Sequence, residues 1–160
     1  MEIKLLRGAA VPSAKRLLRV DHEDVQRFAI HVVKTAVEEY GAEIRSVKFL
    51  CNSRHPSSAA FTPMSYALEV NLNQIRTLRD LVFAIGHEAC HSIQTANMTP
   101  KVMLEKYRRG NFIFGYYHNP LEIEADEFGM KFENDMTYEN HVINPNTSSI
   151  FVQRKLAGRG

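Results

Sequence analysis

Apolar residues recur every three or four positions in three parts of the chain. The first stripe covers residues 21–40. The second covers residues 78–96, where Thr77 and Asp80 form a capping box at the start. The third begins at Pro120, a residue suited to the first turn of a helix. The pattern therefore predicts three long amphipathic helices.

Shorter signals fill the intervals between these stripes. Residues 44–50 and 66–72 are predicted strands, and the second alternates apolar with polar positions, so we place it near or at a sheet edge. Residues 52–63, rich in Ser and Pro, are predicted as a loop, and residues 102–109 as a short helix. Residues 150–152 are either a strand or a docking segment. We therefore expect an α+β domain in which a helix packs on a small, mostly antiparallel sheet.

Length and composition are those of one ordinary globular domain. The 160 residues are 44% hydrophobic and 24% charged, and we expect a single domain over 1–160, with weaker signals in the terminal segments 1–20 and 145–160. No apolar run has the length of a leader or a membrane span, which favours the cytoplasm. The two cysteines, Cys51 and Cys90, are expected to be free thiols.

The motif His87-Glu88-Ala89-Cys90-His91 lies in the middle of the second predicted helix. Residues four apart project from one helix face, so His87 and His91 can present two imidazoles to one metal ion. The motif suits zinc, and Glu88, about 100° away around the helix, can take a proton from an attacking water. An accidental match is the alternative, and a third ligand downstream would count against it.

The candidate third ligand lies in residues 119–126, Asn-Pro-Leu-Glu-Ile-Glu-Ala-Asp. Glu122 and Asp126 are one turn apart beside the apolar stripe, so both can face the helix that carries the histidines. We expect Glu122 to complete the zinc site and Asp126 to accept the outer N–H of a zinc-bound histidine. Glu124 is turned by about 200° from Glu122 and is expected to project towards solvent. A merely acidic surface helix is the alternative, and His118 is the rival third ligand.

Together the two motifs resemble the gluzincin zinc metallopeptidases, the clan of thermolysin, and in particular the small minigluzincins and ImmA/IrrE-type regulatory peptidases. In these small members a strand ending in Asn precedes the zinc helix, similar to residues 68–73, and the glutamate helix reads E-x-E-A-N/D-x-F, similar to residues 122–128. The resemblance covers about residues 66–132 and implies a zincin-like fold. The site residues that it implies are the zinc ligands His87, His91 and Glu122 and the general base Glu88.

The chain also departs from related patterns. Cys90 stands where such families usually carry Gly or another small residue, which leaves specificity open. The continuation typical of metzincins is absent, since Gln94 and Asn97 stand where that pattern has Gly and a third His.

Peptide hydrolysis also needs a donor that stabilises the oxyanion of the tetrahedral intermediate. We favour Tyr117 and His118, because they lie just before the glutamate helix. The full set of downstream candidates is Tyr116, Tyr117, His118, Tyr138 and His141.

The leading hypothesis is an endopeptidase-like zinc enzyme whose polypeptide substrate adds as a strand to the edge near residues 68–73. The second hypothesis is a latent or non-catalytic zinc-containing regulatory or structural protein that binds a protein partner. A third, a nucleic-acid-binding module, would use the basic residues near both ends, although the net charge is only +2. We expect neither a nucleic-acid partner nor a membrane.

Overall fold

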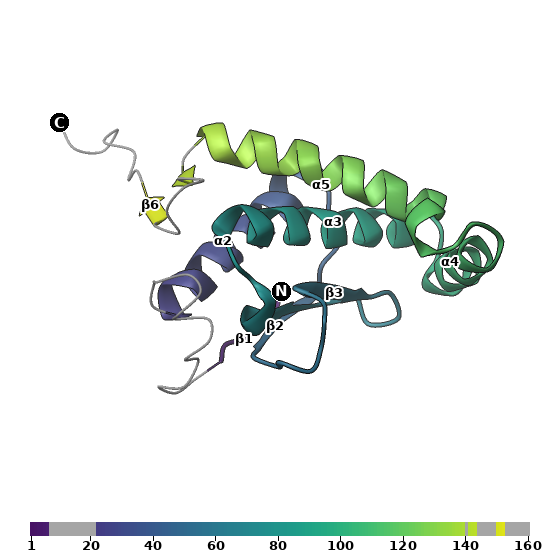
Figure 1. Cartoon of the computed structure of the whole chain (residues 1–160), viewed down its shortest axis with the longest axis horizontal. Helices are drawn as coiled ribbons and strands as arrows, with labels where there is room; N and C mark the ends of the chain where they lie inside the picture. Colours follow the sequence, from purple (N-terminus) through teal and green to yellow (C-terminus); the bar gives the residue numbers. More distant parts are fainter. Residues whose placement is uncertain (7–21, 140, 144–149, 153–160) are drawn as a thin grey trace.

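The computed structural model describes residues 1–6, 22–139, 141–143 and 150–152. After a first strand and a first helix, the described chain has three consecutive strands, then three long helices, and finally two short strands (Figure 1). The elements are β1 (Glu2–Lys4), α2 (His22–Tyr40), β2 (Ser46–Leu50), β3 (Ala59–Thr62), β4 (Ala67–Asn71), the 3-10 turn η1 (Leu72–Gln74), α3 (Leu78–Asn97), α4 (Pro100–Phe114), the 3-10 turn η2 (Tyr116–His118), α5 (Pro120–Glu139), β5 (His141–Ile143) and β6 (Ile150–Val152). The expected α+β class is confirmed.

The main sheet is mixed, so the expectation of a mostly antiparallel sheet is wrong. In the described part of the chain its strand order is β1-β2-β4-β3, with β1 parallel to β2, β2 parallel to β4, and β3 antiparallel to β4. Helix α2 lies between β1 and β2 in the chain, and such a crossover returns the chain in the same direction. A short turn joins β3 to β4, which makes that pair a hairpin.

The free edge of the sheet next to the long helices is β3. This strand lies within residues 52–63, which the sequence predicts as a loop. The strand predicted at the edge, β4, is an interior strand with β2 on one side and β3 on the other. The alternation in β4 has another cause: Leu68 and Val70 are buried, whereas Glu69 is exposed on the opposite face of the sheet.

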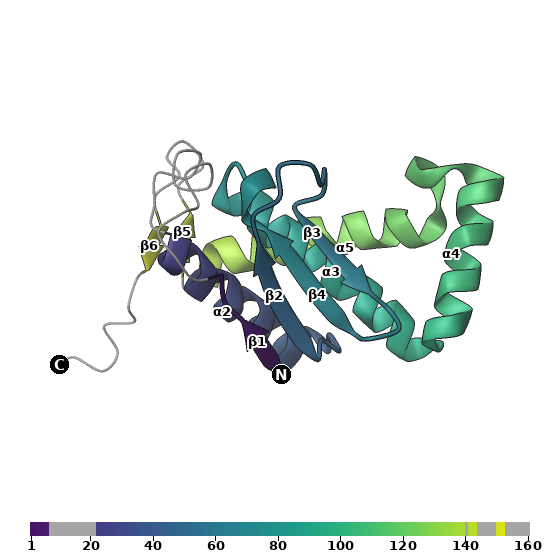
Figure 2. The same ribbon diagram turned by 90° about the horizontal axis from the view of Figure 1, so that it is seen from below.

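Helices cover one face of this sheet in two layers. Helices α2 and α3 lie against the sheet, and α5 packs on the other side of α3 (Figures 1 and 2). The buried apolar side chains of the sheet, α2 and α3 form one cluster that also takes in Phe132 and Met136 of α5. This shared core fixes where α3 and α5 stand relative to the sheet edge.

Two glycines allow α3 and α5 to approach closely. A Cβ added at Gly86 would lie 2.7 Å from Cδ1 of Phe132. A Cβ added at Gly129 would lie 3.0 Å from Cε2 of Phe83. Each helix therefore offers a glycine to an aromatic ring of the other, and the two backbones come near enough for their polar side chains to meet.

The limits of the helices follow local capping signals. Thr77 accepts a hydrogen bond from the backbone N–H of Asp80, which confirms the N-cap of α3. Thr99 caps α4 in the same way, with Pro100 in the first turn, and α4 continues five residues beyond the predicted end at Arg109. Helix α4 stands at one end of the α3–α5 pair (Figure 2).

The described residues near the C-terminus form a small second sheet. Strand β6 pairs antiparallel with β5, so residues 150–152 form a strand. The basic residues between 7 and 21 and beyond 152 lie outside the described residues. In the described part of the chain, no helix has both the length and the apolar character needed to cross a bilayer.

Candidate metal centre

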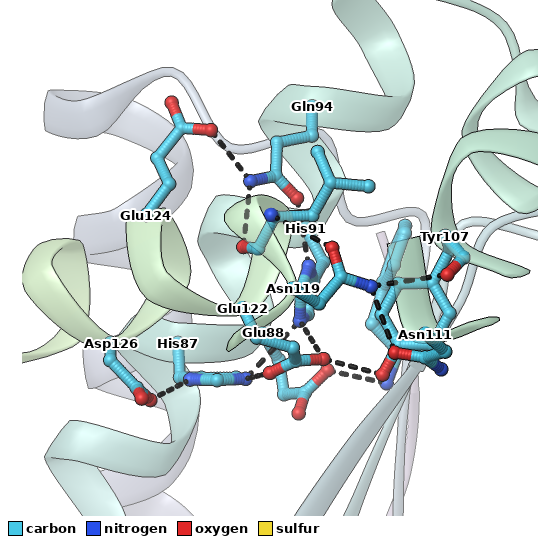
Figure 3. Close-up of polar contacts among 12 residues, drawn as sticks. His87, Glu88, His91, Gln94, Tyr107, Asn111, Asn119, Glu122, Glu124 and Asp126 are labelled. Carbon is cyan, nitrogen blue, oxygen red and sulfur yellow. Dashed lines mark hydrogen bonds and ion pairs between the residues drawn. The ribbon is translucent and has the colours of Figure 1, made fainter. Parts of the chain in front are cut away.

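Three side chains from two helices converge beside the edge strand: His87 and His91 of α3 and Glu122 of α5 (Figure 3). Glu122 Oε2 lies 3.0 Å from Nε2 of His87, and Glu122 Oε1 lies 3.3 Å from Nε2 of His91. The two Nε2 atoms are 3.2 Å apart. The spacing of four residues places both imidazoles on one face of α3, and the first turn of α5 brings the carboxylate to them.

This arrangement fits a metal ion. Each side chain offers one ligand atom, and the three ligand atoms all lie within 4.8 Å of one another. His91 and Glu122 are buried and His87 is nearly so, with 12% of its side chain exposed. A buried group of two imidazoles and one carboxylate is costly without a cation or protons between its members. The cluster can therefore hold a metal ion.

The charges of the site are strongly coupled. Burial lowers the pKa of both imidazoles, but their hydrogen bonds to Glu122 and the charge of Glu88 outweigh it, so both pKa values lie above the usual one. Burial raises the pKa of Glu122. Hydrogen bonds that the protonated imidazoles of His87 and His91 and the Tyr107 hydroxyl donate lower it more, so the pKa of Glu122 lies well below its usual range. The carboxylate therefore stays ionised and available to a cation.

Asp126 holds the outer nitrogen of His87. Its Oδ1 lies 2.9 Å from Nδ1 of His87, one helical turn beyond Glu122 on α5 (Figure 3). A carboxylate at this position accepts the Nδ1 proton and leaves the Nε2 lone pair directed at the cluster. This is the contact with a histidine that the sequence predicts for Asp126.

Glu88 lies beside the cluster without belonging to it. Its Oε2 accepts a hydrogen bond of 2.9 Å from the backbone N–H of Phe61 in β3. Burial raises the pKa of Glu88, and the neighbouring charges of His91 and His87 lower it less, so the net shift is upwards. Glu88 is therefore a better proton acceptor than an exposed glutamate.

A cleft of about 300 Å³ opens between β3, α3 and α4 over these groups. Its floor carries the two histidines, Glu88 and Glu122. Its walls are mostly apolar and aromatic, formed among others by Ala59, Phe61, Met103, Leu104, Tyr107 and Tyr116.

The tyrosines of the cleft are not the ones that the sequence favours. Tyr117 is 86% exposed and His118 is also exposed, and neither lines the cleft, so His118 does not reach the cluster as a third ligand either. Tyr116, the residue before them, lines the cleft. The 3-10 turn η2 explains this, since successive side chains in it point about 120° apart. For Tyr138 and His141 the structure describes the backbone alone.

Tyr107 is hydrogen-bonded to Glu122 of the cluster. The Tyr107 hydroxyl donates a hydrogen bond of 2.5 Å to Glu122 Oε1. Asn119, almost fully buried, donates to the backbone oxygen of Tyr107 and to Asn111, and accepts from the backbone N–H of Leu121. The sequence motifs assign no role to Tyr107 or Asn119. The Asn-Pro pair at the start of α5 is a signal that points to Asn119 as a cap, whereas nothing in the spacing of Tyr107 predicts its contact.

Two residues beyond the motif, Gln94 and Glu124, also contact each other beside the cluster. Gln94 is buried and its Oε1 lies 2.8 Å from Nδ1 of His91. Glu124 is exposed, as expected, and it also accepts a hydrogen bond of 2.8 Å from Gln94 Nε2. Helix α3 passes along the first turns of α5, so Gln94 reaches the face of α5 that carries Glu124.

Cys90 takes no part in the cluster. Both cysteines are free thiols, as expected. Cys90, which precedes His91 in the sequence, is buried. Burial, with the charges of Glu124 and Glu122, raises the pKa of the Cys90 thiol to about 12. It therefore remains a protonated, unreactive core residue.

Comparison of the chain with protein-family models, curated proteins and solved structures found no match.

Proposed function

We propose that the protein is a zinc-dependent peptidase of the zincin type, in which Glu88 acts as the general base. One observation carries this proposal. The half-buried carboxylate of Glu88 stands beside a cluster that can hold a metal ion, at the floor of a cleft, next to a free strand edge. A purely structural metal site needs neither the extra base nor the open cleft.

Zinc is the metal that best suits the donor set. Two imidazole nitrogens and one carboxylate oxygen are the ligands of many hydrolytic zinc sites, whereas calcium and magnesium prefer oxygen ligands throughout. Zinc held by His87, His91 and Glu122 would lower the pKa of a water molecule to about 7 and polarise a substrate carbonyl.

Glu88 is suited to move the proton. The N–H of Phe61 holds its Oε2, which leaves Oε1 to accept the proton of the attacking water. Glu88 then gives that proton to the leaving amine nitrogen as the carbon–nitrogen bond breaks. The raised pKa of Glu88 favours the first transfer, because it makes the carboxylate a stronger base towards the attacking water.

The substrate would lie along β3 instead of β4. The N–H of Phe61 points away from the sheet towards Glu88, so this side of β3 is not paired within the sheet. An extended polypeptide can add to such an edge through its own backbone. Its scissile carbonyl would then face the cluster, and its side chains would meet the apolar walls of the cleft.

Tyr116 is the best placed donor for the oxyanion. Its ring lines the cleft, and burial together with the charges of Glu122 and Glu88 raises its pKa to about 12, so the hydroxyl keeps its proton. Tyr107 lines the cleft too, but its hydroxyl donates a hydrogen bond of 2.5 Å to Glu122 Oε1, whereas a hydrogen bond to Glu122 is only a minor cause of the raised pKa of Tyr116.

The test combines metal analysis with cleavage of a peptide library. The wild type should contain one zinc ion per chain and cleave peptides, and Glu88→Gln should keep the zinc but lose rate by about two to four orders of magnitude. Glu127→Gln, an exposed change on α5, is the control and should match the wild type. Zinc in a wild type that cleaves nothing would reject the peptidase in favour of a zinc-containing regulatory or structural protein.

A further inference from the structure

The two histidines of the cluster are supported in different ways. The outer nitrogen of His87 meets the carboxylate of Asp126, whereas that of His91 meets the side-chain amide of Gln94 (Figure 3). Gln94 follows His91 by three residues on α3, and its side chain is almost entirely buried between α3 and the start of α5.

Helix α5 determines which way the Gln94 amide points. The amide nitrogen lies 3.1 Å from the backbone oxygen of Leu121 and 2.8 Å from Oε2 of Glu124. Neither of these oxygens can donate a proton when Glu124 is ionised, so both amide protons of Gln94 are directed at α5. The reversed amide would place its oxygen against two acceptors. The amide oxygen must therefore face His91.

This orientation selects one tautomer of His91. The Gln94 oxygen can only accept, so Nδ1 of His91 must carry a proton and donate it across the 2.8 Å contact. In the neutral ring the lone pair then belongs to Nε2, the atom directed at His87 and Glu122. The chain of contacts thus runs from the charge of Glu124 through Gln94 to the ligand atom of His91.

We propose that Gln94, oriented by Glu124, is a positioning residue of the metal centre that fixes the tautomer and ring direction of His91. The proposal rests on the metal-binding part of the proposed function and does not require turnover. In this proposal three carboxylates of α5 have separate roles. Glu122 is a ligand, Asp126 accepts the Nδ1 proton of His87, and Glu124 orients the Gln94 amide that accepts the Nδ1 proton of His91.

The tautomer can be measured directly in the metal-free protein. Long-range proton–nitrogen NMR in alkaline solution, where both imidazoles are neutral, distinguishes a ring protonated on Nδ1 from one protonated on Nε2. His91 of the wild type should be protonated on Nδ1. Gln94→Leu removes the acceptor and should shift His91 towards the Nε2–H form that free imidazoles prefer, with His87 unchanged. A His91 that stays protonated on Nδ1 in folded Gln94→Leu would overturn the proposal.

Zinc affinity by competition with a chelator gives the second readout. Gln94→Leu should weaken zinc binding by about ten- to a hundredfold, as expected for a group behind a ligand. Glu124→Ala should weaken it less, because the Leu121 oxygen still holds one amide proton, and Glu124→Gln should restore the wild-type value through its amide oxygen.

Two exposed positions of α5, Glu127 and Glu124, provide the control variant and a variant that should fold. Glu127→Ala removes a carboxylate from the exposed side of α5 and should change neither the tautomer nor the affinity. Glu124 is itself exposed, so Glu124→Ala should fold even if the buried change at Gln94 does not. An affinity of Glu124→Ala equal to that of Glu127→Ala would contradict the role of Glu124. Because neither measurement uses a substrate, failure of peptide cleavage would leave this result interpretable.

Discussion

The two buried faces of α3 are held in place by different physical effects. The face towards the sheet and α2 is apolar, and side chains such as Leu81, Ile85 and Ala89 are fully buried there. The face towards α4 and α5 carries His91 and Gln94, which are buried as well but polar. Burying an apolar side chain stabilises a fold by about 1.5–3 kcal/mol, whereas burying a polar group costs free energy unless it finds a partner.

The difference shows which changes each face can accept. On the apolar face a smaller side chain loses contacts in proportion to its size and affects little else. On the polar face the contacts form a connected chain, from Asp126 through His87 and His91 to Gln94 and Glu124. Removing one member leaves its partner buried and misdirected, so we expect losses in metal binding and rate more than in folding.

Ile85→Ala should produce the largest change in stability. Ile85 is fully buried on the apolar face, and truncation there typically costs about 2–5 kcal/mol of unfolding free energy. Chemical denaturation of the metal-free protein measures it. Zinc content per folded molecule should stay at the wild-type value, and a loss of zinc in well-folded Ile85→Ala would show that the two faces are not independent.

Tyr116→Phe should lower the rate of peptide cleavage and leave the stability of the fold unchanged. It removes one hydroxyl from the cleft and should lower kcat/KM for peptide cleavage by about 10²–10³, the usual effect of losing an oxyanion donor. The unfolding free energy should not change. Tyr117→Phe is the matched control, since Tyr117 is adjacent but points out of the cleft. Equal rates for the two variants would exclude Tyr116 as the donor.

Asp126→Ala should have a smaller effect on the same face. It removes the acceptor of the His87 Nδ1 proton and should weaken zinc binding by about ten- to a hundredfold without abolishing it. Competition with a zinc chelator measures the change, with Glu127→Ala as control. Complete loss of zinc at saturating metal would mean that Asp126 itself is a ligand.

Gly86→Ala tests the close contact between α3 and α5 and should have the smallest effect on the unfolding free energy. The new methyl group would press on the ring of Phe132, which is itself fully buried. Overpacking of this kind costs about 1–3 kcal/mol, and the better helix propensity of Ala offsets up to about 1 kcal/mol of it. The melting temperature should fall modestly, and an increase would show that α5 can move away from α3 freely.

Sequence patterns predict the helices well because an apolar stripe records the side of a helix that faces the core. The predicted ranges of α2, α3 and the start of α5 agree with the structure to within one residue. The end of α4 was missed because its last turn carries exposed aromatics such as Phe112, which follow no stripe.

The sheet was harder to predict, because alternation reports which face of a strand is buried and says nothing about its neighbours. Leu68 and Val70 alternate with exposed Glu69 although β4 is central. The true edge, β3, is short and follows a segment rich in Ser and Pro, so its pattern is typical of a loop.

Spacing along a single helix identified the cluster, and it failed where contacts cross between helices. The shared face of His87 and His91 and the single turn that separates Glu122 from Asp126 are properties of one helix each. The contact of Glu124 with Gln94 depends on how α3 and α5 lie side by side. The helical period predicts that Glu124 points away from Glu122. It carries no information about the neighbouring helix, so it does not predict the contact with Gln94 of α3.

The most direct test of the central claim is a zinc titration of Glu122→Ala against a competing chelator, beside the wild type and Glu127→Ala. Glu122 supplies the carboxylate that lies within reach of both imidazoles, and Glu127 is an exposed neighbour on the same helix. The wild type and Glu127→Ala should each bind one zinc ion, and Glu122→Ala should bind none at micromolar total metal. Retention of zinc by Glu122→Ala at wild-type affinity would contradict the account, because the cluster of His87, His91 and Glu122 would then not be the metal site.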